Sequence, residues 1–208
     1  MERLEYHLLT KPYLDSTVDC VTKVFLYDEP MTQALGMSEA EFQTFVRAIC
    51  EKAVNDKSSY ICGNNKRVIG FALNEDLVGE PLPESVEITP KMSPILNLLG
   101  KLDKTYLKGK RISKGTAFHL FMIGSLREYR NKGIAKKLTD RSLALARRQG
   151  FDRVITEATN RKSQRLLGEY FGFRDRISQS YKYYRFGNKT PFSNIGEESC
   201  ILMELKLR

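Results

Sequence analysis

No run of apolar residues in this sequence is long enough to cross a membrane. The longest apolar stretches, such as Ala117 to Gly124, fall far short of the roughly 18 residues that begin to suggest a membrane span. The opening residues Met1 to Leu4 lack the pattern of a secretory signal. We therefore expect a cytoplasmic protein with no membrane partner.

Cysteine and histidine are also scarce. The four cysteines, Cys20, Cys50, Cys62 and Cys200, are irregularly spaced, form no C-x-x-C pair and are accompanied by only two histidines. This set of ligands argues against a metal centre, and the chain shows no sign of secretion, where disulfides are common. We expect reduced thiols in the core and no metal.

Positive charge is in excess, with 34 Lys and Arg against 25 Asp and Glu and a formal net charge of +9. A phosphorylated cofactor, nucleic acid or an anionic membrane could each account for such a balance. The sequence contains no helix-turn-helix or ribonucleoprotein motif, and the basic residues gather around one helix start and its solvent face, at Arg141, Arg147 and Arg148. Nucleic acid is therefore the less favoured partner, and a non-enzymatic basic module that binds it stays an alternative.

The first part of the chain predicts strands and helices of one compact domain, residues 1–208. Residues 3–9 alternate apolar and polar side chains as a strand does, and an apolar series at helical spacing starts at Leu14. Ser38 and Glu41 form a capping box before a second helix. Two β-rich runs joined by residues 63–66 predict a hairpin.

An insertion at residues 79–112 follows this hairpin. Four of the seven prolines lie between Gly79 and Pro94, which predicts a loop. Ile95, Leu98, Leu102 and Tyr106 then recur at the spacing of an amphipathic helix.

Residues 116–173 follow a strand, helix, strand, helix order, which is typical of two adjacent parallel strands joined by a right-handed crossover. We expect the first helix at 133–149 and the second at 162–171. Two further strands are expected at 173–186 and 199–207. Tyr181, Tyr183 and Tyr184 favour the first of these by strand propensity.

The most informative motif is Arg130-Asn131-Lys132-Gly133-Ile134-Ala135, placed where a strand ends and a helix begins. Unpaired amide groups and the helix dipole make such a helix start an anion site, and small residues let a diphosphate approach the backbone. Nearby positive side chains strengthen this prediction: Arg127, Arg130, Lys132, Lys136 and Lys137.

The run from His119 to Phe173 resembles the GNAT acetyltransferase superfamily. Its signature Q/R-x-x-G-x-G/A is matched by Arg130, Gly133 and Ala135, its N-x-x-S pair by Asn160 and Ser163, and its closing Gly-Phe by Gly172-Phe173. The resemblance implies an α+β (mixed α/β) GNAT fold, with a central, mostly antiparallel twisted sheet flanked by helices. The helical insertion precedes the strand that binds the cofactor.

The same resemblance implies acetyl-CoA as the acetyl donor. Backbone groups of Ile123 and Ser125 would hold the pantetheine arm, and Asn160 and Ser163 would lie beside the thioester. The pyrophosphate would be held by the amides of the loop and first helical turn: Arg130, Asn131, Lys132, Gly133, Ile134, Ala135 and Lys136.

A narrower resemblance, to insect-type arylalkylamine N-acetyltransferases, rests on Asp28-Glu29-Pro30, the helix near 95–107 and the loop motif. In those enzymes a Glu of an acidic D-E-P sequence is the catalytic base, which implies that role for Glu29. Two hydroxyl residues four apart match Thr159 and Ser163. Gly168 stands where many GNAT enzymes carry a Tyr that acts as the general acid.

The sequence thus predicts an N-acetyltransferase for a small, arylalkyl or other primary amine, acting as a monomer or homodimer. Acetylation of protein lysines or N-termini is an alternative within the same class. Structural roles compete for each residue: Glu29 as an acidic helix start, Thr159 or Ser163 as helix caps, and His119 as a hydrogen-bonded core histidine.

Overall fold

The computed structural model describes residues 4–64 and 67–208. The strands are β1 (Glu5–Leu8), β2 (Tyr60–Asn64), β3 (Arg67–Asp76), β4 (Ala117–Ser125), β5 (Arg153–Ala158), β6 (Arg174–Ser180) and β7 (Ser199–Lys206). The helices are α1 (Leu14–Asp28), α2 (Pro30–Ala34), α3 (Glu39–Asp56), α4 (Ser93–Leu107), α5 (Ile134–Arg148) and α6 (Arg161–Arg165). Short turns of 3₁₀ helix lie at Lys11–Tyr13, Pro90–Met92 and Arg127–Tyr129.

These strands form one sheet in the order β1-β2-β3-β4-β5-β7-β6. Neighbouring strands are antiparallel except for β4 and β5, which are parallel. A crossover helix is what joins parallel neighbours, and α5 supplies it. This confirms the predicted mixed, mostly antiparallel sheet flanked by helices.

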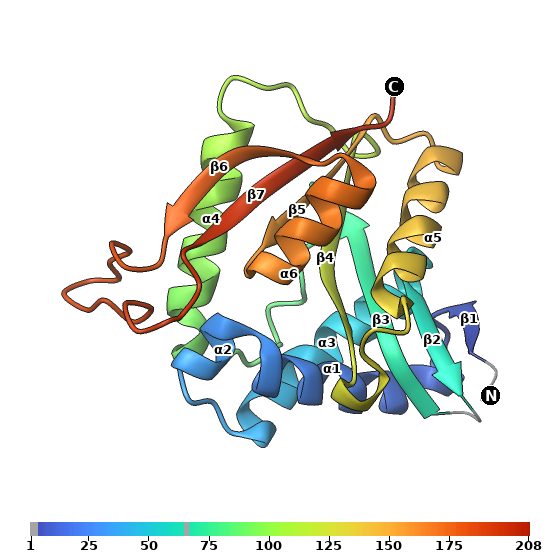
Figure 1. Cartoon of the computed structure of the whole chain (residues 1–208), viewed down its shortest axis with the longest axis horizontal. Coiled ribbons are helices and arrows are strands. Elements are labelled where there is room, and N and C mark those ends of the chain that lie inside the picture. Colours follow the sequence, from blue (N-terminus) through green and yellow to red (C-terminus); the bar gives the residue numbers. More distant parts are fainter. Residues whose placement is uncertain (1–3, 65–66) are drawn as a thin grey trace.

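Helices cover both faces of the sheet. In Figure 1, α5 and α6 lie on the near face, whereas α1, α3 and α4 lie on the far face. α1 and α3 pack over β3, and α4 packs over β6. The short α2 continues from α1 and stands beside the region between α4 and α6 (Figure 1).

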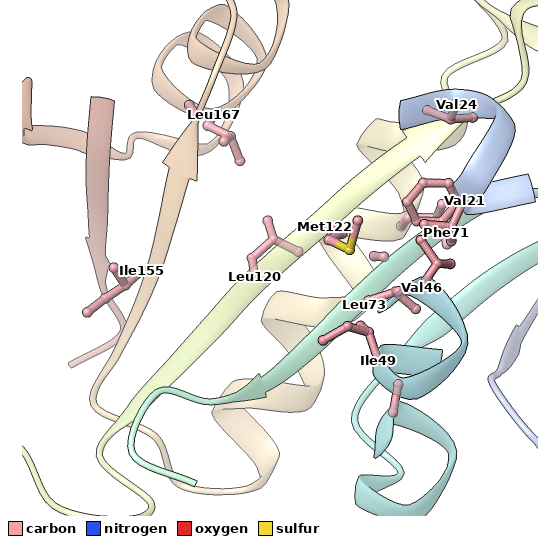
Figure 2. Packing of buried hydrophobic residues seen from close by; sticks show 14 of the residues in the cluster. Val21, Val24, Val46, Ile49, Phe71, Leu73, Leu120, Met122, Ile155 and Leu167 are labelled. Atoms are coloured by element: carbon pink, nitrogen blue, oxygen red, sulfur yellow. The ribbon is translucent and has the colours of Figure 1, made fainter. Parts of the chain in front are cut away.

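The core on the far face comes from the predicted helical stripes. Figure 2 shows Val21 and Val24 of α1 and Val46 and Ile49 of α3 packing toward Phe71, Leu73 and Met122 of the sheet. All of these side chains are buried. Burying one such side chain stabilises a fold by roughly 1.5–3 kcal/mol, so this layer fixes α1 and the segment that follows it.

Local signals explain where several elements begin. Ser38 accepts a hydrogen bond from the Glu41 amide and the Glu41 carboxylate accepts one from the Ser38 amide, so the predicted capping box starts α3. β2 and β3 pair antiparallel as predicted, although residues 65 and 66 of the expected turn lie outside the described residues. The insertion forms loop and turns over 79–89 before α4 begins at Ser93, again as predicted.

Two predicted elements differ in detail from the structure. The second helix of the motif is helical over its predicted range, but it is an α-helix over Arg161–Arg165 and a π-helix over Leu166–Tyr170. The strand expected over 173–186 ends at Ser180, so the strand prediction for the three tyrosines is wrong. Tyr181 and Tyr184 are both buried; a spacing of three residues suits a turn, whereas a strand repeats every two.

Candidate active site

A cavity of about 960 Å³ opens where β4 and β5 separate. The two strands pair only over Ala117–His119 and Arg153–Ile155, although both continue further. Just beyond this pairing, the register of β3 with β4 shifts between Leu73 and Asn74, a bulge of the kind that often lies next to active sites. Among the cavity-lining residues are Ile123, Gly124 and Ser125 on one side and Thr159, Asn160 and Ser163 on the other.

Glu29 lies at this cavity and also starts α2. Its carboxylate accepts hydrogen bonds from the Met31 amide at 3.1 Å, the Thr32 amide at 2.6 Å and the Thr32 hydroxyl at 2.6 Å. Glu29 is only 7% exposed. Burial raises the pKa of this carboxyl group, and the hydrogen bonds from Thr32, Met31 and Thr159 oppose that rise. Glu29 is therefore a helix cap that also presents a buried carboxylate to the cavity.

The residues that follow β5 form the opposite wall. Asn160, and neither Thr159 nor Ser163, caps α6: its side-chain oxygen accepts a hydrogen bond from the Ser163 amide at 2.9 Å. The Ser163 hydroxyl donates to the Asn160 carbonyl at 2.8 Å. The Thr159 carbonyl accepts a hydrogen bond from the Tyr181 hydroxyl at 2.8 Å. The structure thus brings Glu29, Thr159, Asn160 and Ser163 together around one cavity.

The start of α5 has the features expected of an anion site. Gly133 adopts the left-handed conformation (φ +72°) and Asn131 a positive φ of 61°. Within the described part of the chain, no side chain caps this helix, so its first amide groups lack partners inside the helix. A Cβ atom built on Gly133 would meet no atom within 4 Å. Arg130, Asn131, Lys132, Gly133 and Lys136 are exposed, and Ala135 reaches the cavity while Ile134 is buried. Such an open, uncapped start fits a diphosphate group.

Most of the positive side chains predicted around this loop contact an acidic or an aromatic side chain. Arg127 and Arg130 both bind Asp28, at 2.8 Å and 2.6 Å. The Lys132 ammonium lies 4.9 Å from the centre of the Tyr129 ring and the Lys136 ammonium 4.5 Å from that of Tyr170. Asp28, the neighbour of Glu29, therefore ties the acidic segment to the loop.

Several residues of the cavity were not predicted from the sequence. α4 and the turn before it contribute Met92, Ile95, Leu96 and Leu99; further walls come from Phe42, Phe45, Phe121 and Glu157. The insertion thus forms an apolar wall of the cavity. A glutamate inside the apolar strand Arg153–Ala158 is the signal that could have identified Glu157, because charged residues are rarely buried without a partner.

His119 is a buried, hydrogen-bonded histidine. Its Nε2 lies 2.7 Å from Glu157 Oε2 and its Nδ1 lies 3.2 Å from Glu75 Oε1. Burial opposes its charge, but the two carboxylates outweigh burial and raise its pKa well above the ordinary value. Tyr170, near the place of the family's Tyr acid, is 64% exposed, and Gly168 occupies that place itself.

The model of the acetyltransferase (GNAT) family matches residues 24–173, well over half of the chain. The chain therefore belongs to this family, and it is an acyltransferase. In the described residues, no helix is both long and apolar enough to cross a membrane.

Solved structures agree with this assignment. The C-terminal condensation domain of Ebony, in complex with β-alanyl-dopamine, matches over 100% of both chains with a TM-score of 0.88 and 20% identity. Arylalkylamine N-acetyltransferase 2 from Aedes aegypti matches over 99% of this chain and 100% of its own, with a TM-score of 0.81 and 23% identity. A polyamine N-acetyltransferase from Drosophila melanogaster has a TM-score of 0.72 at 13% identity, over 99% of this chain and 100% of its own. These similarities confirm the fold predicted from the resemblance to insect arylalkylamine N-acetyltransferases.

Proposed function

We propose that this chain transfers the acetyl group of acetyl-CoA to the primary amine of a small arylalkylamine, with Glu29 as the general base. The observation that carries the proposal is the buried carboxylate of Glu29, which lines the same cavity as the parted strands β4 and β5 and the start of α5. Donor and acceptor can meet there without a covalent enzyme intermediate, since positioning two reactants already lowers the barrier.

The donor side would use the features of the loop. The free amides at the start of α5 and the turn around Gly133 would hold the pyrophosphate, and the backbone of Ile123 and Ser125 would hold the pantetheine arm. Acetyl-CoA, when bound, supplies a thioester whose carbonyl carbon the amine attacks as the C–S bond breaks. A backbone amide of β4 near Ile123 would stabilise the developing oxyanion.

Glu29 would first bind the acceptor as an ammonium ion. A primary amine has a pKa of roughly 10, so it arrives protonated at neutral pH and must lose a proton before its nitrogen can attack. A carboxylate with a raised pKa is better matched to that transfer, which contributes on the order of 10² to 10⁴ in rate. Glu29 takes the proton from nitrogen and later returns it to solvent.

Ser163 and Thr159 would assist the departing sulfur. A thiol has a pKa of about 8.5 by analogy with cysteine, so its thiolate needs only a hydrogen bond and then a solvent proton. In the structure the Ser163 hydroxyl donates its one proton to the Asn160 carbonyl, so it would rotate away from that oxygen to donate to the sulfur. This role makes the absence of Tyr at position 168 compatible with activity.

The apolar wall of α4 supports a small acceptor. Ile95 and Leu99 lie on the insertion and line the cavity together with Glu29, so the apolar part of a small acceptor would contact them. Phe42, Phe45 and Phe121 offer aromatic surface to an aryl group.

A thiol-release assay tests the proposal. With acetyl-CoA as donor, we expect thiol release with arylalkylamines, weaker release with aliphatic diamines, and none above background with lysine peptides. Because the Ebony domain was solved with β-alanyl-dopamine, a β-alanyl thioester of pantetheine is included as a second donor. Release with peptides alone would favour the protein-acetylating alternative. Thermal stabilisation by DNA but not by acetyl-CoA would contradict the enzyme proposal.

A further inference from the structure

Two carboxyl groups meet between α4 and the sheet. Asp103 lies on α4 and Glu157 on β5, and the two groups are within hydrogen-bonding reach of each other. As ionised groups, Oδ1 of Asp103 and Oε1 of Glu157 are both buried without a hydrogen-bond partner among the described residues. Ionised carboxylates only accept hydrogen bonds, so two of them cannot bond to each other. A single proton on either group supplies the missing donor.

The positive charge near Glu157 is already shared by two carboxylates. His119 Nε2 lies 2.7 Å from Glu157 Oε2, and His119 Nδ1 lies 3.2 Å from Glu75 Oε1. Glu75 in turn binds Lys52 at 3.1 Å. A protonated, neutral Asp103 fits this balance, whereas an ionised Asp103 would add a negative charge that no neighbour compensates.

The other titratable groups around Asp103 are neutral or paired. Burial raises the pKa of the Cys200 thiol on β7 well above its ordinary value, so this thiol stays neutral. Burial also raises the pKa of Tyr106, on the next turn of α4, and Glu204 beside it is bound by two arginines. The remaining charged residues of α4 and of β6, on which α4 packs, are exposed: Lys101, Lys104, Arg174, Asp175 and Arg176. The charge at Asp103 is therefore governed by Glu157 and by the groups bound to it.

The pair lies at one end of the apolar wall of α4. Asp103 is four residues beyond Leu99, which lines the cavity, and Glu157 lines the same cavity, so the two acids join this wall to β5. At the other end of α4, the Tyr184 hydroxyl donates to the Pro94 carbonyl at 2.9 Å. Burial raises the pKa of this phenol above its ordinary value, so that bond does not change near neutral pH. The attachment at Asp103 is the one that a proton controls.

We propose that Asp103 is a positioning residue for the acceptor site: a proton shared with Glu157 holds α4, and with it the apolar wall of the cavity, against β5. This inference rests on the proposed function. Burial and the nearby Glu157 raise the pKa of Asp103 to about 8. The pair therefore keeps its proton at neutral pH and loses it as pH rises through about 8. Ionised Asp103 then repels Glu157, and α4 is held less firmly.

This arrangement predicts a pH-dependent KM for the amine. An acceptor that needs α4 in place loses apparent affinity in proportion to the fraction of molecules that keep the proton. One pH unit above a pKa of about 8, that fraction is about one in ten. Asp103→Asn is the reference, because its amide donates to Glu157 at every pH. The ratio of KM in wild type to KM in Asp103→Asn should be about one at pH 7 and about ten at pH 9.

The test measures KM and kcat with phenylethylamine and acetyl-CoA between pH 7 and pH 9. The ratio of kcat in the two proteins should stay constant, because saturating amine selects the protonated pair. The ratio of KM for acetyl-CoA should also stay constant. Glu84→Gln is the control, because it removes an exposed carboxylate of the same insertion; its KM for the amine should rise with pH as in wild type.

Three kinetic results would overturn the inference. The KM ratio could stay constant with pH, or it could fall, which would mean that the buried negative charge attracts the ammonium ion. The rise in KM could also persist in Asp103→Asn, where His119 still faces Glu157; it would then come from His119 or from the amine itself.

A second measurement needs neither turnover nor a stable variant. In wild type labelled with ¹³C at the aspartate carboxyl carbons, one NMR signal should titrate near pH 8, and Asp103→Asn should lack it. If every aspartate signal of wild type titrates in the ordinary carboxyl range, the pair shares no proton at neutral pH and the inference is wrong.

Calorimetry of phenylethylamine binding separates this inference from the proposed function. An affinity ratio that changes about tenfold between pH 7 and pH 9 without any acetyl transfer would support the role of Asp103 and contradict the proposed activity. Acetyl transfer with the same KM ratio at both pH values would contradict the role of Asp103 and leave the proposed activity in place.

Discussion

The guanidinium of Arg130 lies 2.6 Å from the carboxylate of Asp28. This pair joins the loop that starts α5 to the segment that carries Glu29, two regions far apart in the sequence. Arg127 binds the same carboxylate at 2.8 Å. The two ion pairs hold the proposed base at a fixed position relative to the proposed donor loop.

Replacing Asp28 tests this connection. Asp28→Asn should lower the free energy of unfolding by only about 1 kcal/mol, since ion pairs to exposed arginines are weak. Its kcat/KM should nevertheless fall about tenfold, because Glu29 and the loop are no longer held together. Steady-state kinetics and thermal unfolding provide the measurements. Asp15→Asn, which removes an exposed pair with Arg47, is the control; equal activities of the two variants would contradict the connection.

Replacing the carboxylate of Glu29 by an amide tests its role as the general base. Glu29→Gln should reduce kcat/KM at pH 7 by about 10² to 10⁴. The deficit should shrink as pH rises toward the pKa of the amine, because the free amine then needs no base. A pH–rate profile of both proteins gives the result. Glu41→Gln, at the exposed capping box of α3, should leave the profile unchanged, and unchanged kinetics of Glu29→Gln would remove Glu29 as the base.

The raised pKa of Glu29 also predicts how stability depends on pH. In the folded state the carboxyl group holds its proton more tightly than in the unfolded state, so wild type loses stability as pH rises from the ordinary carboxyl range through the folded pKa. Glu29→Gln lacks that ionisation. Its melting temperature relative to wild type should therefore increase from pH 4 to pH 7 in thermal unfolding, and a constant difference would mean that the pKa of Glu29 is unshifted.

The parts of the site that the sequence predicted are those encoded by residues close together in the chain. The order of β4, α5 and β5, the uncapped start at Gly133 and the Asn160 and Ser163 pair each follow from a short pattern. The helix of the insertion was predicted from its apolar spacing. The cavity that this helix covers was not predicted, because the apolar stripe of a helix does not specify which residues the helix packs against.

The unpredicted parts depend on contacts between distant residues. No local pattern brings Asp28 to Arg130, or Glu157 to His119 and Asp103. The tyrosines after β6 show the same limit: Tyr184 donates to the Pro94 carbonyl at 2.9 Å, and this tertiary contact outweighs its strand propensity.

Gly133 tests the proposed diphosphate site. Gly133→Ala should weaken acetyl-CoA binding by about tenfold or more, as measured by calorimetry. A methyl group would stand where the phosphate approaches, and the alanine backbone would be strained at φ +72°. Gly109 has a similar φ of +74° and is equally open. Gly109→Ala therefore carries the same strain away from the loop and should leave binding intact. Equal affinities of wild type and Gly133→Ala would refute the loop assignment.

Gly124 tests the packing between β4 and α1. A Cβ atom at this position would lie 2.6 Å from Val24 Cγ1 and 3.1 Å from Phe71 Cζ, inside the core layer shown in Figure 2. Gly124→Ala should cost about 1–3 kcal/mol, as overpacking does, and each kcal/mol lowers Tm by about 2–4 °C in a protein of this size. Gly100→Ala is the matched variant: its Cβ would meet nothing within 4 Å on α4, so it should raise stability by about 0.5–1 kcal/mol. If Gly124→Ala were as stable as Gly100→Ala, α1 would not approach β4 as closely as this packing requires, and the position of Glu29 at the end of α1 would need revision.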